Sequence, residues 1–275
     1  MPKMTDLRLG EIDLQLTRGD YEVLKMLRRF HFMRTDQIKR IFMSWKECSE
    51  RGKLSATTRL LHRLEKHKLI YHLPRRNRPM RGGTYGLVWH LTENGVRILR
   101  LREGTTGQRF RPHEPTDKFL THTLAVVETF VVYVETVRAH KNMEPIAFEV
   151  EREAMREFKI DGKKTSIRPD MFICVKIDGP RYFMYIEVDL GTEGAAEIAA
   201  KCKRYIDYHR IGKAKEEHGV FPLVLWVVPD EARKEWIRKT VSKATKGWTR
   251  IHSVVTLEEF PRLLAEDDFW NESRI

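Results

Sequence analysis

Three carboxylates in the second half of the chain have the types and spacing that metal-dependent chemistry requires. They are Asp170, Glu187 and Asp189. The segment 177–180, Ile-Asp-Gly-Pro, predicts a tight hairpin between two strands, and a turn centred there places Asp170 opposite Glu187. Side chains alternate along a strand, so we expect all three carboxylates to project from one face, together with Arg168.

Such a cluster of negative charge calls for a cation. Carboxylates on one face repel one another unless a positive charge lies among them. Oxygen ligands with room for water are typical of Mg²⁺ or Mn²⁺, and such an ion can activate water for attack on a phosphodiester. We therefore expect a Mg²⁺ or Mn²⁺ cofactor. Two other interpretations stay open: a surface hairpin in which Arg168 pairs with Asp189, and a silent nuclease fold retained for protein contacts.

The elements that must position these residues are strands mixed with helices. Alternating apolar residues and turn signals predict strands at 146–152, 167–176, 181–190, 220–228 and 250–255. Helical spacing of apolar residues predicts helices at 118–138, 193–208 and 230–244. The mixture predicts a layered α/β domain built on a mixed sheet.

The order of these residues resembles that of the restriction-endonuclease-like superfamily, whose signature is written PD-(D/E)xK. The signature corresponds here to Pro169-Asp170 and to Glu187-Val188-Asp189, with aspartate where the superfamily has lysine. Some members carry that lysine on the next helix, where Lys201 lies. The resemblance implies that Asp170 and Glu187 bind the metal and that Asp189 assists or orients. Lys201 would stabilise the developing charge or position the water.

Two further residues are candidates for the same site. Glu128, on the helix at 118–138, would be an extra metal ligand, and Tyr205, one turn beyond Lys201, would flank the pocket. Packing at a helix edge is the alternative for both residues. An ion pair with Glu197, one helical turn away, is the alternative for Lys201.

The positive charge of the chain lies in its first part. Residues 1–115 hold 25 Lys and Arg against 12 Asp and Glu, whereas residues 116–275 hold 26 against 27. Lys and Arg gain affinity for phosphates by displacing condensed counterions, so the asymmetry indicates a polyanion partner for the N-terminal part. A merely solvated basic surface is the alternative.

Three helices are predicted within this basic part. The first begins after the N-cap residue Thr17, the second covers 36–45, and the third begins after Ser55 and continues to His67. The third helix has a leucine stripe for burial, and its opposite face carries hydroxyls and long cations, which suits a recognition helix in a major groove. The predicted DNA-binding residues of this helix are Thr57, Thr58, Arg59, Arg63 and Lys66.

A strand, a loop and a returning strand follow, as in a wing. The strands are predicted at 69–73 and 84–91, and a helix at 93–101 comes next. The loop 74–83 is rich in Arg, Pro and Gly, a composition that cannot pack a core but can lie along phosphates or in a minor groove. Its predicted DNA contacts are Arg75, Arg76, Arg78 and Arg81. A protein-binding or merely solvated loop is the alternative.

These patterns predict an α+β protein of two domains. An N-terminal winged helix-turn-helix is expected at 1–102, a linker at 103–117, and a restriction-endonuclease-like α/β domain with a mixed sheet at 118–275. The sequence has no uninterrupted apolar stretch of spanning length and no secretion signal, so we expect a cytoplasmic protein. The three cysteines, Cys48, Cys174 and Cys202, lack zinc-site spacing and are expected to be reduced packing residues.

The basic winged helix, followed by Arg168-Pro169-Asp170 and by the run Ile-Glu-Val-Asp-Leu-Gly-Thr-Glu at 186–193, resembles the replication-relaxation family. The resemblance covers roughly residues 14–230. It implies a protein of a plasmid, phage or integrative element of bacteria, with a role in replication or in DNA topology at an origin.

The expected function is therefore DNA processing in the replication of a mobile element. The winged helix would bind duplex DNA, and the C-terminal domain is a candidate Mg²⁺-dependent endonuclease or nickase. The alternative is a non-catalytic replication or transcription regulator whose nuclease-like domain mediates dimerisation or recruits a partner. Expected partners are double-stranded DNA and the replication or mobilisation machinery; a homodimer is left open, and no membrane is expected. A metabolic enzyme finds little support, because the chain has no glycine-rich phosphate loop, nucleophile elbow or zinc-protease motif.

Overall fold

The fold divides into two compact units, residues 1–131 and 132–275. This computed structural model describes residues 4–43, 47–73, 86–105 and 114–266. The division between the units falls within one helix, α6 (Asp117–Ala139), so the first part of this helix belongs to the N-terminal unit. The sequence predicts a boundary earlier in the chain, at 103–117.

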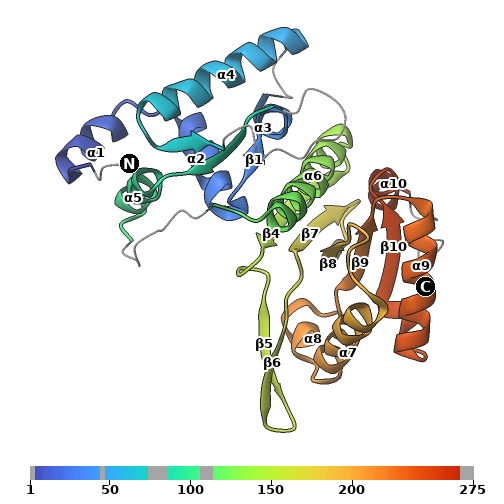
Figure 1. The fold of residues 1–275 in the computed structure, drawn as a ribbon. Helices are drawn as coiled ribbons and strands as arrows, with labels where there is room; N and C mark the ends of the chain where they lie inside the picture. The colour runs from blue at the N-terminus through green and yellow to red at the C-terminus, as the bar shows by residue number, and fades with distance from the viewer. Residues whose placement is uncertain (1–3, 44–46, 74–85, 106–113, 267–275) are drawn as a thin grey trace. The chain divides into compact units, whose positions relative to one another are not determined.

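The N-terminal unit combines helices with a small antiparallel sheet (Figure 1). In chain order its elements are α1 (Asp6–Asp13), α2 (Arg18–Phe30), β1 (Met33–Arg34), α3 (Thr35–Met43), α4 (Glu50–Lys66), β2 (Ile70–His72), β3 (Val88–Leu91) and α5 (Glu93–Glu103). The strand order in the sheet is β1-β3-β2. Apart from β1 and α1, which the sequence patterns did not reveal, this is the predicted order of elements. Most of the predicted wing, with its four arginines, lies outside the described residues.

Two helix starts show how local hydrogen bonds define this unit. The α2 helix begins after Thr17 as predicted, with a capping box formed between Thr17 and Asp20. The α4 helix begins after Ser49, whose hydroxyl accepts the Gly52 N–H at 3.2 Å. The predicted start after Ser55 is therefore wrong. A glycine usually weakens a helix interior, and Gly52 made a helical segment look like a loop.

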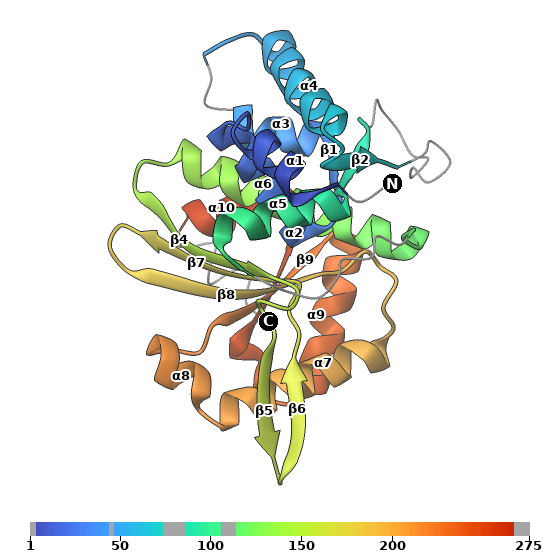
Figure 2. The same ribbon diagram turned by 90° about the vertical axis from the view of Figure 1, so that its left-hand side faces the viewer.

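The C-terminal unit is built on a five-stranded mixed sheet (Figure 2). Its elements after α6 are β4 (Met143–Val150), β5 (Arg156–Ile160), β6 (Lys163–Ile167), β7 (Met171–Ile177), β8 (Arg181–Val188), α7 (Ala195–Arg210), α8 (Lys213–His218), β9 (Leu223–Val228), α9 (Glu231–Thr245), a short 3-10 turn (Thr249–Ile251), β10 (His252–Thr256) and α10 (Phe260–Ala265). The strand order is β10-β9-β8-β7-β4. Strands β4, β7 and β8 pair antiparallel, whereas β8, β9 and β10 pair parallel. The predicted α+β class and mixed sheet are confirmed.

The hairpin of β7 and β8 has the predicted register. Met171 pairs with Ile186 and Lys176 pairs with Arg181, so the alignment continues to Asp170 opposite Glu187. The Asp170 N–H donates to the Ile186 carbonyl at 3.0 Å, one step beyond the last strand pair. The turn at 177–180 therefore sets which carboxylates face each other.

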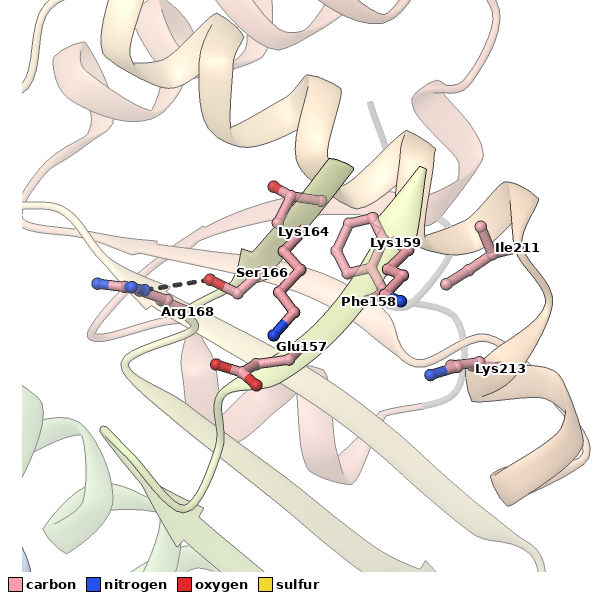
Figure 3. A pocket seen from close by; sticks show the side chains of 9 residues that line it. Glu157, Phe158, Lys159, Lys164, Ser166, Arg168, Ile211 and Lys213 are labelled. Carbon is pink, nitrogen blue, oxygen red and sulfur yellow. Dashed lines mark hydrogen bonds between the residues drawn. The ribbon is translucent and has the colours of Figure 1, made fainter. Parts of the chain in front are cut away.

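A second hairpin, β5 and β6, was not predicted. The predicted strand 167–176 is in fact two elements, because Ile167 ends β6 and β7 begins only at Met171. Pro169 lies in the gap and cannot donate a ladder hydrogen bond, which explains the interruption. Residues from both strands of this hairpin, with Ile211 just before α8 and Lys213 at its start, line a cavity of about 550 Å³ (Figure 3).

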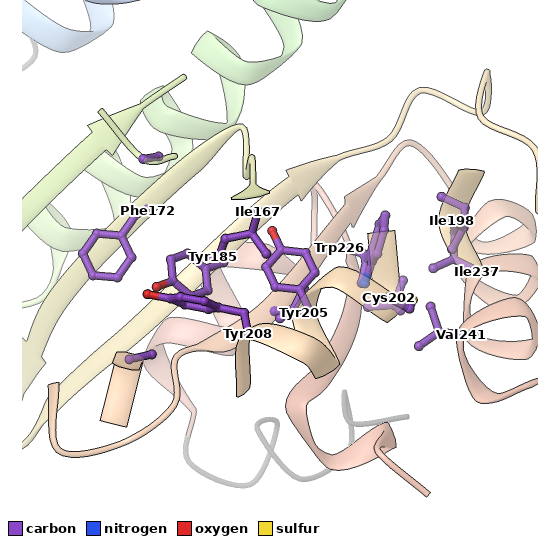
Figure 4. Packing of buried hydrophobic residues seen from close by; sticks show 14 of the residues in the cluster. Ile167, Phe172, Tyr185, Ile198, Cys202, Tyr205, Tyr208, Trp226, Ile237 and Val241 are labelled. Carbon is purple, nitrogen blue, oxygen red and sulfur yellow. The ribbon is translucent and has the colours of Figure 1, made fainter. Parts of the chain in front are cut away.

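The core of the C-terminal unit lies between the sheet and two helices (Figure 4). Tyr185 and Trp226 from the sheet, Cys202 and Tyr205 from α7, and Val241 from α9 are all buried in one cluster. Cys174 is buried as well, so both cysteines of this unit are packing residues as predicted. Cys48 is exposed, which corrects the prediction for that residue.

By length and composition alone, α6 is apolar enough to cross a membrane. More than half of its apolar window is buried inside the protein. The core helix of a soluble protein passes the same test, so this helix is weak evidence for a membrane segment.

His252 on β10 makes a testable contribution to acid sensitivity. Burial lowers the pKa of His252 from 6.5 to about 3, and its Nδ1 lies 3.4 Å from the Trp226 indole N–H, which donates to it. Below pH 6.5 this histidine becomes protonated in the unfolded chain but stays neutral in the folded chain. The free energy of unfolding therefore falls as pH falls. At pH 5 we expect a loss of about 2 kcal/mol from this residue.

The check is chemical denaturation of the native chain and of His252→Leu at pH 7 and pH 5. The difference between the two pH values should be smaller in the variant by about that amount. An equal difference in both proteins would contradict the buried neutral state of His252.

Candidate active site

The centre of the site is the carboxylate of Glu187, near the end of the central strand β8. Its side chain is only 2% exposed. Oε2 accepts a hydrogen bond from the Lys201 ammonium at 2.8 Å, and Oε1 accepts one from the Tyr205 hydroxyl at 2.5 Å. Both donors come from α7, one turn apart. The structure thus brings Lys201 and Tyr205 to this carboxylate, and the catalytic role expected of Lys201 stays a prediction.

Lys201 is held between two carboxylates. Besides Glu187 it donates to Glu193 Oε1, also at 2.8 Å, and its ammonium lies 5.7 Å from the centre of the Trp226 ring. The alternative pairing with Glu197 is wrong, because Glu197 accepts the Gly194 N–H and caps the start of α7. The lysine therefore projects into the site from a rigid helix.

Burial sets the protonation of this group of side chains. Burial raises the pKa of Glu187 to about 7, and the nearby charge of Asp170 adds to the rise, while Lys201 and Tyr205 oppose it. Burial alone would lower the pKa of Lys201, but the contacts with Glu187 and Glu193 raise it above its ordinary value. Burial also raises the pKa of Tyr205, which stays a neutral donor. A cation that binds Glu187 would compete with a proton near neutral pH.

Asp170 is fixed beside Glu187 by the main chain of β8. Its Oδ2 accepts the Val188 N–H at 2.7 Å. Together with the main-chain bond to Ile186, this contact anchors the short segment that leads into β7. The two carboxylates predicted to face each other therefore lie at one end of the hairpin, Asp170 just before β7 and Glu187 near the end of β8.

Asp189 has a different partner from the one that the sequence suggested. Its Oδ2 accepts from the Arg233 guanidinium at 2.6 Å, and its Oδ1 accepts from the Gly191 N–H. The proposed pair with Arg168 is wrong, because Arg168 donates to Ser166 on β6 at 3.2 Å instead. The guanidinium of Arg233 also donates to the Glu193 carbonyl at 2.7 Å.

Arg233 and Glu193 are site residues that sequence reasoning missed. Arg233 lies in the first turn of α9, far along the chain from the carboxylates, and no spacing rule connects it to them. Glu193 is the last residue of the run 186–193, and its residue type alone indicated no role for it. Its position just before α7, which carries Lys201, was the available signal.

The donor set fits a hard divalent cation in part. Asp170 and Glu187 supply carboxylate oxygens, and each oxygen has more than one lone pair, so the bonds from Lys201 and Tyr205 leave acceptor capacity. Asp189 fits less well as a ligand, because both of its oxygens already accept hydrogen bonds. Within the described ranges, no group of three or more His, Cys, Asp or Glu side chains is arranged to hold a metal. Mg²⁺ is commonly held by one or two carboxylates together with water and substrate phosphates.

Glu128 does not belong to this donor set, which corrects the prediction of an extra metal ligand. Its carboxylate is engaged in the N-terminal unit, where it pairs with Arg34 at 2.8 Å and with Arg40. The Gln37 amide donates to the same carboxylate at 2.9 Å. Two guanidinium groups already neutralise Glu128, and the residue joins α6 to α3 and β1.

The α4 helix presents a narrower cationic face than predicted. Leu60, Leu61 and Leu64 are buried as expected. Thr57 is also fully buried and bonds to the Lys53 carbonyl, so it cannot contact DNA as proposed. The predicted contacts that remain exposed or half-exposed are Thr58, Arg59, Arg63 and Lys66, and the structure adds Arg51 and His62 to the exposed side of the helix.

Arg63 has a structural partner that changes its expected role. Its guanidinium donates to Asp20 at 2.6 Å, and the Asp20 side chain is fully buried. Removing Arg63 would leave a buried carboxylate without its cation, and such losses are strongly destabilising.

We expect Arg63→Ala to lower the free energy of unfolding by about 2 kcal/mol, because the pair is partly exposed on the arginine side. Arg59→Ala, on the same helix and exposed, is the matched control and should change it by less than about 0.5 kcal/mol. Thermal or urea unfolding measures both. Equal stability of the two variants would show that the Asp20 contact contributes nothing.

A family model described as replication-relaxation matches residues 24–224 of the chain. No curated protein matches the sequence of the chain. Among solved structures, a weak similarity is found to the structure of restriction endonuclease FokI, with 12% sequence identity and a TM-score of 0.24. The match covers 94% of this chain and 74% of that chain.

Proposed function

Because the chain belongs to the replication-relaxation family, we propose that it processes DNA in replication by cutting or nicking a duplex that it binds. The C-terminal unit would cleave with Mg²⁺ or Mn²⁺, and the N-terminal unit would bind the duplex. One observation carries the catalytic part of this proposal. A fully buried carboxylate, Glu187, is flanked by Asp170 and receives a lysine and a tyrosine from the next helix.

A buried carboxylate beside a second carboxylate is uncommon among side chains that serve only to hold the fold together. Burying a carboxylate is unfavourable, and a hydrophobic residue at this position would pack without that penalty. A buried acid with a strongly raised pKa beside a second acid is typical of functional sites. The raised pKa of Glu187 and the position of Asp170 therefore favour a catalytic role for this site.

Each residue of the site would have its own role in phosphodiester hydrolysis. Asp170 and Glu187 would hold the cation, which when bound would polarise the phosphate and make water more acidic. Lys201 would orient the attacking water or stabilise charge on the phosphate oxygens. Asp189, held by Arg233, would keep the loop after β8 in place for Lys201 and Glu193. Water would add to phosphorus, and one ester oxygen would leave as a hydroxyl.

One observation favours a second candidate, a non-catalytic regulator. Asp189 stands where the endonuclease signature has lysine, and Arg233 neutralises it. Lys201 pairs with Glu187 in the same way, so each of these two carboxylates has a cationic partner without a metal. In that case the C-terminal unit would mediate dimerisation or recruit replication or mobilisation proteins. Cleavage that depends on Asp170 and Glu187 separates the two candidates.

For the N-terminal unit we propose duplex binding through the exposed side of α4 and through the arginines of loop 74–83. The support is the excess of Lys and Arg in residues 1–115 and the exposure of Arg59 and Lys66 on one helix. A bacterial mobile element as the source and a cytoplasmic location stay predictions.

The salt dependence of binding tests this part. Each phosphate contact that is lost should lower the slope of log affinity against log salt by about one. Arg59→Ala with Lys66→Ala should therefore weaken binding of a labelled duplex and reduce the slope by about two, measured by fluorescence anisotropy. Lys25→Ala with Lys118→Ala removes the same charge from α2 and α6 instead of α4 and serves as the control. An unchanged slope in the α4 double variant would exclude this helix from the interface.

A further inference from the structure

The hairpin of β5 and β6 carries a local excess of positive charge in a unit whose charges balance as a whole. Residues 156–168 hold five Lys and Arg against two Asp and Glu, although residues 132–275 together hold 25 against 25. Figures 1 and 2 show the hairpin extending away from the five-stranded sheet of its own unit. The charge is therefore concentrated on a projecting element.

The strand register brings like charges together on this hairpin. Lys159 pairs directly with Lys164, and the next pair on the same face of the hairpin is Glu157 and Ser166. Like charges that lie directly opposite each other destabilise an antiparallel pair. The two lysines thus do not stabilise the hairpin, and an anion between them would relieve the repulsion.

The cations of this face are free of carboxylate partners. Lys159, Lys164, Arg168 and Lys213 line one cavity, and in the part of the chain that the structure describes no carboxylate lies within ion-pair distance of any of them. Elsewhere in the unit, cations commonly have such partners, as Lys203, Arg233 and Lys234 do. Glu157 lines the same cavity and leaves its net charge positive.

The side chains that line the cavity suit phosphate groups. The cavity is open to solvent and has a volume of about 550 Å³, between the hairpin and the start of α8 (Figure 3). Thr165 and Ser166 add hydroxyl groups beside the four cations. Cations combined with hydroxyls are the side chains that most often bind the phosphates of a nucleic acid.

We propose that this cavity and the lysines beside it bind the phosphate backbone of DNA, as a contact of the C-terminal unit additional to those of α4. The inference rests on the DNA binding proposed above and assigns part of it to the β5–β6 hairpin. The contact reads no base sequence. It holds the strand against the unit that carries Glu187.

The test compares four full-length proteins by fluorescence anisotropy on one labelled duplex over a series of salt concentrations. They are the native chain, Lys159→Gln with Lys164→Gln, the matched control Lys163→Gln with Lys239→Gln, and Arg59→Ala with Lys66→Ala. The control removes two exposed lysines, one from the same hairpin but the other strand face and one from α9. Thermal unfolding of each protein accompanies the titration.

Loss of Lys159 and Lys164 should weaken binding about tenfold at moderate salt and lower the salt slope by about two. The control should change affinity less than about twofold, and the melting temperature of the hairpin variant should stay equal or rise, because a repulsion is removed. Native affinity and slope in the hairpin variant, or an equal loss in the control, would overturn the inference. If the hairpin variant behaves as the native chain while the α4 variant loses binding, the inference fails and the proposed duplex binding stands. If no protein binds DNA, both fail.

Discussion

Glu187→Gln is expected to reduce DNA cleavage by at least about a thousandfold while leaving the protein folded. Glutamine keeps the shape of the side chain and an oxygen for the Tyr205 hydroxyl, which is 2.5 Å from Oε1 in the native protein. It removes the negative charge that would hold the cation. Burial raises the pKa of the native carboxylate, and Lys201 keeps its second contact with Glu193, so the neutral variant should still fold near neutral pH.

Lys201→Met should reduce the same activity by about a hundredfold, because one electrostatic group is lost while the cation ligands remain. Two matched controls lie on the same helix. Glu197→Gln keeps an oxygen for the Gly194 N–H, and Lys203→Met removes an exposed lysine that pairs with Asp207. Both controls should retain native cleavage rates in a plasmid assay. Full activity in Glu187→Gln would remove this carboxylate from the mechanism.

Gly95→Ala is expected to destabilise the N-terminal unit by about 3 kcal/mol or more. A methyl group on Gly95 would lie 2.1 Å from the Leu69 carbonyl oxygen and 2.9 Å from a side-chain carbon of Leu91. That carbonyl already accepts the Thr92 N–H at 3.0 Å, so it cannot move aside without breaking the contact that joins α5 to β2. The main chain itself must shift to admit the methyl group.

The control for this prediction is Gly10→Ala, also a glycine within a helix. Nothing lies within 4 Å of a methyl group at that position. Replacing an unhindered helical glycine usually stabilises by roughly 0.5 to 1 kcal/mol, so the two substitutions should have opposite signs. Urea unfolding of both variants measures them. A neutral Gly95→Ala would mean that α5 and β2 pack less closely than the structure shows.

Local sequence patterns predicted most of the helices and strands, and they also predicted the strand register that brings the two carboxylates together. The turn at 177–180 placed Asp170 opposite Glu187 because a two-residue hairpin turn fixes the register of both its strands. The cap of α2 at Thr17 followed from one side chain and its neighbours. The β5–β6 hairpin escaped prediction because its strands are short and polar, and alternation of apolar residues is what reveals a strand.

The candidate site was predictable where its residues share a hairpin or the next helix. Lys201 was predicted from the resemblance to superfamily members that carry the lysine on this helix, and Tyr205 because it lies one helical turn beyond Lys201. Arg233 was missed, and Glu128 was wrongly included, because such contacts depend on how distant segments pack. Glu128 bonds instead to Arg34 and Arg40, which lie close to it only in the folded N-terminal unit.

The most direct test of the catalytic claim is cleavage of a supercoiled plasmid that carries the DNA flanking the gene. The native chain and the double variant Asp170→Ala with Glu187→Ala are compared in Mg²⁺ or Mn²⁺, with a chelator as a further control, and binding is followed on the same DNA by gel shift. Nicked or linear plasmid from the native chain alone, and only when metal is present, is the predicted result. Intact plasmid in every lane, while the native chain still binds DNA, would contradict it and leave a non-catalytic regulator.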